Sequence, residues 1–266
     1  MSVGEVDRSA ARVSASRVFS KVPEITVLFW VIKVLTTGMG ETTSDYLART
    51  YDPVLAVGAV GIVFMLSLVA QLLVRRYLAP VYWFAIVMVS VFGTMVADVI
   101  HVRFGVPYAV STVGFAVALA AIFGGWYLCE GTLSIHSIRT RRRELFYWAA
   151  VLATFALGTA AGDLTATTLR LGYFASGVLF AVVIAVPAVA HSRFGMNPVL
   201  AFWFAYVTTR PLGASFADWL GVPPRRHGLN LGTGPVSLTL GVIIVCLVAY
   251  LAATRVDVEV RDVDLM

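Results

Sequence analysis

The chain contains eight apolar segments, and their length is the feature that restricts its fold most. They lie near residues 25–47, 54–74, 80–100, 107–129, 146–168, 172–190, 198–219 and 235–254. A helix needs about 20 residues to cross a hydrocarbon core about 30 Å thick, and in lipid the backbone must satisfy its own polar groups. With 59% hydrophobic and 13% charged residues, the chain is too apolar for a soluble domain. The sequence therefore predicts an all-α integral membrane protein of eight transmembrane helices.

The connections between these segments carry unequal numbers of basic residues. Thirteen Lys and Arg residues fall on the side of the two chain ends, and five fall on the other side. Because basic loops stay in the cytoplasm, we expect both termini there, in a multi-pass protein of a bacterial inner membrane whose main partner is the lipid bilayer. The same asymmetry accounts for the pI near 9.4, so the basic charge does not indicate nucleic-acid binding.

One motif, aromatic-Trp-x9-Gly-x4-Asp, occurs four times without a gap. Its copies begin at Phe29-Trp30, Tyr82-Trp83, Tyr147-Trp148 and Phe202-Trp203. Each copy opens an odd-numbered segment that an even-numbered one follows, so the pattern predicts four repeated helical hairpins in two pseudo-symmetric four-helix halves. The motif glycines are expected to pack helices closely, with a hinge as the alternative.

These patterns divide the chain into five expected units. They are a cytoplasmic N-terminal arm, a first four-helix half, a cytoplasmic basic loop, a second four-helix half and a cytoplasmic tail, at residues 1–22, 23–130, 131–145, 146–254 and 255–266.

All charged residues within the segments lie on odd-numbered segments. They are Lys33, Glu41, Asp45, Asp98, Asp163, Arg210 and Asp218. Because charges inside a membrane normally face the interior of a helical bundle, the odd-numbered helices are expected to form an inner ring that the even-numbered helices cover. Positions 7, 11 and 15 after each motif Trp share one helical face, and Thr37, Thr94 and Thr159 extend the polar stripes on that face.

The four motif aspartates stand near the C-terminal ends of their helices, where the helix dipole disfavours a carboxylate. Solvation at the membrane surface is one explanation for them, and convergence on a cation is the other. Carboxylate and hydroxyl oxygens suit hard cations such as Mg²⁺, Mn²⁺, Ca²⁺ or a trivalent ion. The candidate metal ligands are therefore Glu41, Asp45, Asp98, Asp163 and Asp218. The candidate residues that line the pathway or balance its charge are Lys33, Thr37, Thr94, Thr159 and Arg210.

The two intramembrane cations break the fourfold pattern. Lys33 is expected to pair with Glu41 or with a carboxylate of a neighbouring helix. Arg210 precedes Pro211, which removes a backbone hydrogen bond and is expected to kink the helix. A permanent structural ion pair is the alternative role for both cations.

These residues favour a transporter, an exporter or exchanger whose substrate is a hard divalent or trivalent metal cation. A proton-coupled carrier of a small organic solute is the alternative, because the same carboxylates can relay protons. A structural or assembly protein is a further alternative. An intramembrane enzyme with paired aspartates is disfavoured, because the sequence has no nucleophile–base motif. We expect no enzymatic activity and no tightly bound cofactor, and oligomerisation is left open.

Several of these residues belong to longer motifs. They are Lys21-Val-Pro-Glu-Ile-Thr26, Phe29-Trp-x2-Lys33, Gly40-Glu41-x3-Asp45, Glu130-Gly-Thr-Leu-Ser-Ile-His136 and Thr209-Arg-Pro-Leu-Gly-Ala-Ser215 with Asp218. In these motifs the chain, apart from its two ends, resembles a bacterial family labelled as uncharacterised membrane-anchored proteins. The resemblance implies a membrane location and no particular activity.

Overall fold

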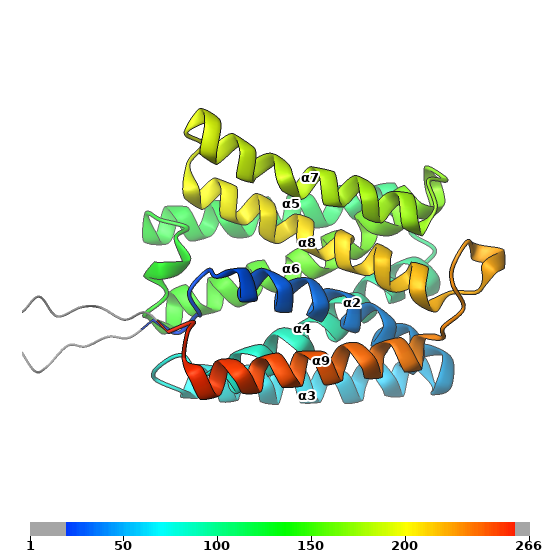
Figure 1. The fold of residues 1–266 in the computed structure, drawn as a ribbon, viewed down its shortest axis with the longest axis horizontal. Helices are drawn as coiled ribbons and strands as arrows, with labels where there is room; N and C mark the ends of the chain where they lie inside the picture. The colour runs from blue at the N-terminus through cyan, green and yellow to red at the C-terminus, as the bar shows by residue number, and fades with distance from the viewer. Residues whose placement is uncertain (1–19, 259–266) are drawn as a thin grey trace, which may run out of the picture.

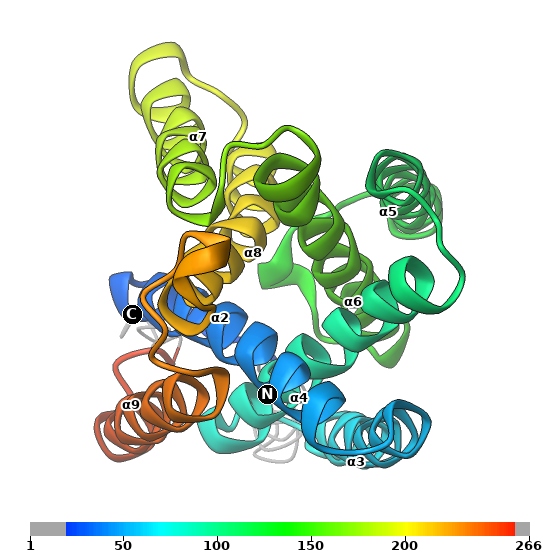
Figure 2. The ribbon, with the colours of Figure 1, turned by 90° about the vertical axis from the view of Figure 1, so that its right-hand side faces the viewer.

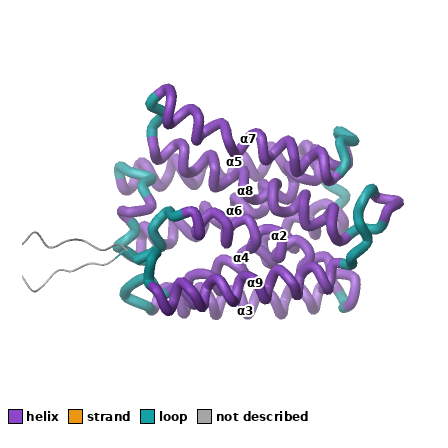
Figure 3. The backbone as a smooth tube through the Cα atoms, viewed as in Figure 1, coloured by secondary structure: helices purple, strands orange, loops and turns teal. Residues whose placement is uncertain are grey.

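The computed structural model describes residues 20–258, and these form eight long helices and no strand. The helices run side by side in one bundle (Figures 1 and 3). Their bounds are α2 (Val27–Thr50), α3 (Pro53–Leu73), α4 (Ala79–Asp98), α5 (Tyr108–Glu130), α6 (Arg141–Asp163), α7 (Tyr173–Phe194), α8 (Pro198–Gly221) and α9 (Thr233–Thr254). The eight predicted helical segments are therefore confirmed. Most of the expected N-terminal arm and tail, 1–19 and 259–266, lies outside the described residues.

Short single-turn helices complete the chain. Two π-helical turns, η1 (Val99–Arg103) and η3 (Leu164–Thr168), extend α4 and α6, and two 3₁₀ turns, η2 (Ile135–Ser137) and η4 (Pro224–Arg226), lie in connecting loops. Because the last third of the expected basic loop, 141–145, belongs to α6, the connection between the two halves is shorter than the sequence pattern suggested.

Local sequence determines where the long helices begin and end. Thr26, Asp52, Thr140 and Asn197 each accept a hydrogen bond from a backbone N–H of the following helix's first turn. These side chains satisfy donors that a helix start leaves unpaired. Gly131 ends α5 in a left-handed conformation at φ 69°, which glycine adopts without steric cost.

Six of these helices are long and apolar enough to span a membrane. They are Pro53–Leu73, Ala79–His101, Tyr108–Glu130, Arg141–Thr168, Tyr173–Phe194 and Thr233–Thr254. The other two long helices are α2, which contains Lys33 and Glu41, and α8, which contains Arg210 and Asp218. The two helices that do not meet this criterion therefore each contain charged residues of both signs, and their place in the bundle decides how those charges are accommodated.

The odd-numbered segments form the centre of the bundle, as predicted. Helices α2, α4, α6 and α8 contact one another in that order, and α8 closes the ring on α2. The remaining helices α3, α5, α7 and α9 lie outside this ring (Figure 2). The inner helices contain most of the buried residues, whereas each outer helix buries only a few. The outer helices thus shield the inner ring from their surroundings.

The outer helices pack differently from simple hairpins. Helix α3 packs on α4, α5 on α6 and α7 on α8, while α9 returns to α2. The two helices within one sequence repeat contact each other much less. The outer helix of each repeat therefore packs on the inner helix of the next repeat. The outer helix of the last repeat, α9, packs on the inner helix of the first, α2, and this non-covalent contact closes the ring.

The four motif glycines lie where neighbouring inner helices come closest. A Cβ atom built on each would approach the next helix of the ring: 1.8 Å from Ser90 Oγ at Gly40, 2.8 Å from Phe155 Cβ at Gly93, 2.2 Å from Arg210 Cγ at Gly158 and 1.9 Å from Thr37 Oγ1 at Gly213. In every case the partner lies seven residues after the motif Trp of its own repeat. The predicted packing role of these glycines is confirmed, because no other residue fits at these contacts.

Replacing Gly40 with alanine is expected to destabilise the bundle. The added methyl group would meet Ser90 Oγ at 1.8 Å and the Ser90 backbone carbon at 2.9 Å. Overpacking of this kind costs about 1–3 kcal/mol, which exceeds the gain of about 1 kcal/mol for alanine over glycine in a helix. Thermal unfolding of the purified protein in detergent measures the loss.

The matched control is Gly114→Ala on α5, where no atom lies within 4 Å of the added Cβ. This variant should retain or slightly raise the melting temperature. Equal shifts for Gly40→Ala and Gly114→Ala would contradict the close packing of α2 against α4.

Candidate cation site

Arg210 of α8 lies at the centre of the ring and contacts the other three inner helices. Its Nη2 donates to Glu41 Oε2 on α2 at 2.6 Å and to Thr159 Oγ1 on α6 at 2.7 Å, and it also bonds Thr94 Oγ1 on α4. Its Nη1 donates to the Thr37 carbonyl oxygen at 3.1 Å. The Arg210 side chain is fully buried and Glu41 is 5% exposed, so one guanidinium joins all four inner helices.

The two threonines at this level act as acceptors. Thr94 Oγ1 donates its proton to the Ser90 carbonyl at 2.9 Å, and Thr159 Oγ1 donates to the Phe155 carbonyl at 3.0 Å. Their lone pairs are therefore available to the guanidinium. Glu41, Thr94 and Thr159 each stand eleven residues after a motif Trp, and together they form one layer of oxygens across the ring.

Lys33 lies close to Phe155, whose ring centroid is also 5.6 Å from Arg210 Cζ, and it has no carboxylate partner among the described residues. Its Nζ is 4.2 Å from the ring centroids of both Phe155 and Tyr206. Among the described residues no carboxylate lies within 4 Å of it and no atom hydrogen-bonds to it. The predicted pairing of Lys33 with Glu41 is wrong, because Arg210 binds that carboxylate. Two aromatic faces stabilise the lysine instead.

The four motif aspartates lie at the end of the bundle where the inner helices finish, which we call the aspartate end. Asp98 Oδ2 accepts a hydrogen bond from Ser44 Oγ at 3.2 Å. Asp218 is buried and Asp163 is half-buried. Asp98, Asp163 and Asp218 are each close enough to Glu41 and Asp45 to interact with them electrostatically. These carboxylates therefore lie near one another at this end of the bundle.

Asp45 is the least enclosed member of this group. Its side chain is 24% exposed, and its Oδ2 accepts from Arg49 Nη2 at 2.5 Å within the same helix. Between residues 20 and 258, no three Asp, Glu, His or Cys side chains lie close enough together to hold one metal ion. The structure thus brings the predicted carboxylates to one end without assembling them into a metal site.

Arg226 of η4 reaches the aspartate end from outside the ring. Its Nη2 bonds the Tyr173 hydroxyl, and its Cζ lies 5.3 Å from the Tyr173 ring centroid. Burial works to lower the pKa of the Arg226 guanidinium. The nearby Tyr173, Asp218 and Asp45 side chains raise it more, so that the net shift of this pKa is upward. The sequence pattern did not indicate this role, because Arg226 stands in a loop and matches no repeated motif.

Aromatic side chains fill the ring one turn from Lys33, toward the N-terminal ends of the inner helices. The first aromatic of each motif, Phe29, Tyr82, Tyr147 and Phe202, is buried there. Tyr82 and Tyr147 hydroxyls lie 2.5 Å apart, and the Phe29 and Phe202 ring centroids lie 6.2 Å apart. The aromatic half of the motif therefore fills the ring toward the end of the bundle where both described chain ends lie, which we call the terminal end.

A buried polar cluster lies at the terminal end. Lys21 Nζ forms an ion pair with Glu144 Oε2 and donates to the Leu72 carbonyl at 3.2 Å. Gln71 Nε2 lies 3.3 Å from both Glu144 Oε1 and the Lys21 carbonyl. Lys21 was expected in the N-terminal arm and Glu144 in the basic loop. The first-turn position of Glu144 in α6 favours a carboxylate, but no local signal indicates its partner.

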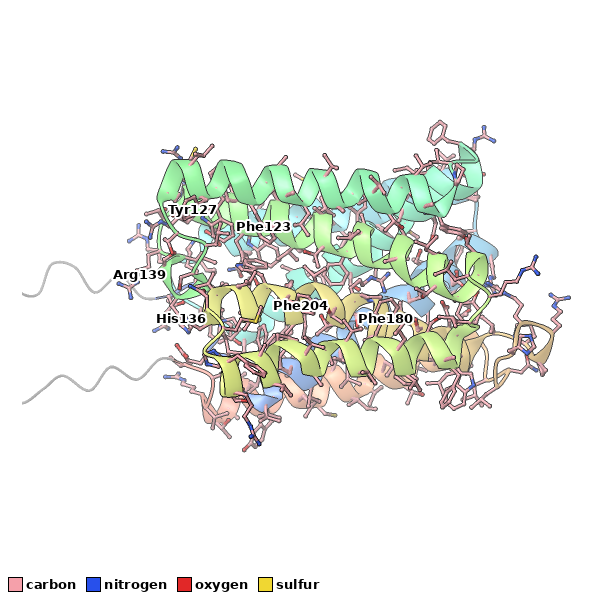
Figure 4. The ribbon with its side chains drawn as sticks, turned by 90° about the horizontal axis from the view of Figure 1, so that it is seen from above. Phe123, Tyr127, His136, Arg139, Phe180 and Phe204 are labelled. Carbon is pink, nitrogen blue, oxygen red and sulfur yellow. The ribbon has the colours of Figure 1, made fainter. Side chains whose placement is uncertain are left out.

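The segments at the terminal end are also joined through Asp257. Tyr77 donates its hydroxyl proton to Asp257 Oδ2, and the Glu24 N–H donates to the Asp257 carbonyl at 2.9 Å. Burial raises the pKa of Asp257, and burial together with this bond raises the pKa of Tyr77. The loop of residues 131–140, where Figure 4 shows His136 and Arg139, covers the same end.

The comparisons with known proteins agree with the repeat. The family model described as Repeat of Unknown Function (DUF347) matches the chain four times, over residues 28–77, 81–132, 146–197 and 201–257. An all-helical protein of four repeats, with six helices apolar enough to span a membrane, is the class that the fold defines. The chain belongs to the DUF347 repeat family. No curated protein and no solved structure matches it.

The Arg210–Glu41 pair is expected to couple the inner helices energetically. Glu41→Gln leaves the guanidinium without its counter-charge, and Arg210→Gln leaves the carboxylate without its own, so each should cost about 3–5 kcal/mol of unfolding free energy. The double variant removes both charges and should lose less than the sum of the single variants. Additive losses in a double-mutant cycle, measured by thermal unfolding in detergent, would contradict the direct pair.

Asp257 should make the stability of the terminal end depend on pH. Its folded pKa lies above the unfolded value of about 3.9, so its contribution is fully present below that value and is lost as pH rises through the folded pKa. Asp257→Asn keeps an acceptor for Tyr77 and does not ionise. The stability of the natural protein relative to Asp257→Asn should therefore fall as pH rises from 4 to 8, and a constant difference in melting temperature would contradict this.

Proposed function

We propose that this protein is a membrane carrier of cations, with all eight helices crossing a bacterial inner membrane and both termini in the cytoplasm. The observation that supports this most is the oxygen layer of Glu41, Thr94 and Thr159, which surrounds a cation in the buried centre of the ring. Burying a cation so deeply is costly unless several oxygens receive it. The inner ring is therefore built to hold positive charge.

Charge at the aspartate end supports the same proposal. The four motif aspartates and Glu41 form a group of neighbouring carboxylates there. A cluster of charges of one sign attracts ions of the opposite sign. Cations would enter at this end, while Arg226 supplies a counter-charge at the rim when the site is empty.

The two ends of the ring differ in a way that suits a carrier. The terminal end is closed by the aromatic layer and by the Lys21–Glu144 cluster. Transport through such a ring requires the two ends to open in turn. The Lys21–Glu144 pair is the bond that would have to break when the terminal end opens, and non-covalent closure of the ring between α9 and α2 allows such movement.

A hard metal cation is the first substrate candidate, carried as an exporter or exchanger. Carboxylate and hydroxyl oxygens suit ions such as Mn²⁺. Because the carboxylates stand apart in this conformation, a metal ion would have to draw them together on binding. The second candidate is a proton-coupled carrier of a small organic cation. A specific observation favours it: the group now bound in the oxygen layer is itself a nitrogen cation.

The carboxylates are the test of the carrier. Flux of Mn²⁺ into proteoliposomes should fall about tenfold or more, the factor that corresponds to 1.4 kcal/mol, when all four motif aspartates are changed to asparagine. Asp52→Asn is the matched control at the same end, because Asp52 is exposed and only caps α3, a role that asparagine also fills.

Unchanged flux in the fourfold variant, with a melting temperature near that of the natural protein, would reject the proposed pathway. If Mn²⁺ shows no flux in the natural protein, the same vesicles are assayed for pH-driven uptake of guanidinium. The second candidate predicts uptake that the fourfold variant loses, and absence of both fluxes would reject the carrier altogether.

A further inference from the structure

We infer that the oxygen layer is a binding cage for a small monovalent nitrogen cation, guanidinium or ammonium in type, and that Arg210 occupies it as a tethered substitute. A role of this cage in transport rests on the proposed carrier function, whereas binding of the cation to the cage does not. Four oxygens from three helices face the guanidinium: Glu41 Oε2, Thr94 Oγ1, Thr159 Oγ1 and the Thr37 carbonyl.

The repeat explains why this is a cage and not only an ion pair. The residues eleven positions after the four motif Trp residues are Glu41, Thr94, Thr159 and Ala214. Three equivalent positions carry an oxygen, and the fourth, on the helix of Arg210 itself, carries a methyl group. An ion pair needs Glu41 alone, but equivalent positions of a repeat surround one point on the ring axis.

The charge of the cage matches a monovalent cation. One carboxylate supplies a single negative charge, and two hydroxyls and a carbonyl supply neutral oxygens. A divalent ion would remain only half neutralised in a buried site. Every cage atom is an acceptor toward the guanidinium, so the best ligand brings several N–H donors.

Arg210 stands on α8 one turn before Ala214, the residue at the level of the cage, and its side chain reaches the cage from there. Its side chain runs past Gly158, where a Cβ atom would lie 2.2 Å from Arg210 Cγ, so the motif glycine provides the space for the arm. Lys33 Nζ lies 4.2 Å from the centroid of Phe155, and Arg210 Cζ lies 5.6 Å from the same centroid.

Chemical rescue of Arg210→Ala tests this cage. The variant removes the tethered guanidinium and leaves its space open, so free guanidinium chloride at low millimolar concentration should bind and raise the melting temperature by about 5 °C or more in a saturable manner. The natural protein, whose cage is filled, should show no such rise. Tetramethylammonium has the same charge but no N–H donor and should not rescue.

Two variants show whether the ligand binds in the cage. Adding Thr94→Val and Thr159→Val to Arg210→Ala removes two acceptors. The guanidinium concentration that gives half of the maximal stabilisation should then rise at least tenfold. Arg226→Ala is the matched control, because it removes an arginine that lies outside the ring, and guanidinium should not stabilise it.

Arg210→Ala is also produced with guanidinium in the medium, in case it does not fold alone. Folded protein recovered only in guanidinium is then the expected result, and no folded protein in either medium overturns the inference. An equal rise with tetramethylammonium, or in the natural protein, overturns it as well. Because the readout is binding, rescue without cation flux keeps the cage and rejects the carrier, whereas flux without rescue keeps the carrier and rejects the cage.

Discussion

The buried bond between Arg210 and Glu41 is the interaction on which the inner ring depends. A guanidinium in a fully buried place is tolerated only when its charge is compensated, and here the partners of its two terminal nitrogens come from α2, α4 and α6. These three helices must therefore present one face each to the same point. The motif glycines allow this, because they let neighbouring inner helices approach at the level next to Arg210.

The repeat provides a symmetric frame around an interior that is not symmetric. Four equivalent glycines pack the ring, four aromatic residues fill its terminal end and four aspartates surround its other end. Lys33, Glu41 and Arg210 have no counterparts of the same charge in the other repeats. The symmetric positions thus build the scaffold, and the three exceptions give its centre the cation and the carboxylate on which the proposed function rests.

Much of this architecture follows from the sequence, because segment length and helical periodicity act locally. They predicted eight helices, an inner ring of the odd-numbered ones and close-packed glycines. The partner of Glu41 did not follow, because Lys33 and Arg210 are both suitable cations and only the order of helices in the ring decides between them. The pairing of Lys21 with Glu144, and the packing of each outer helix on the next repeat, likewise depend on contacts between distant segments.

The most direct test of this account is a magnetic-resonance measurement of the distance between the Arg210 guanidinium and the Glu41 carboxylate in lipid. With arginine side chains labelled with ¹⁵N and glutamate carboxylates with ¹³C, the account predicts a close contact, consistent with Nη2 and Oε2 at 2.6 Å. The contact should vanish in Glu41→Gln and persist in Arg226→Lys. A Glu41 carboxylate in contact with the Lys33 ammonium, or with no cation at all, would contradict it.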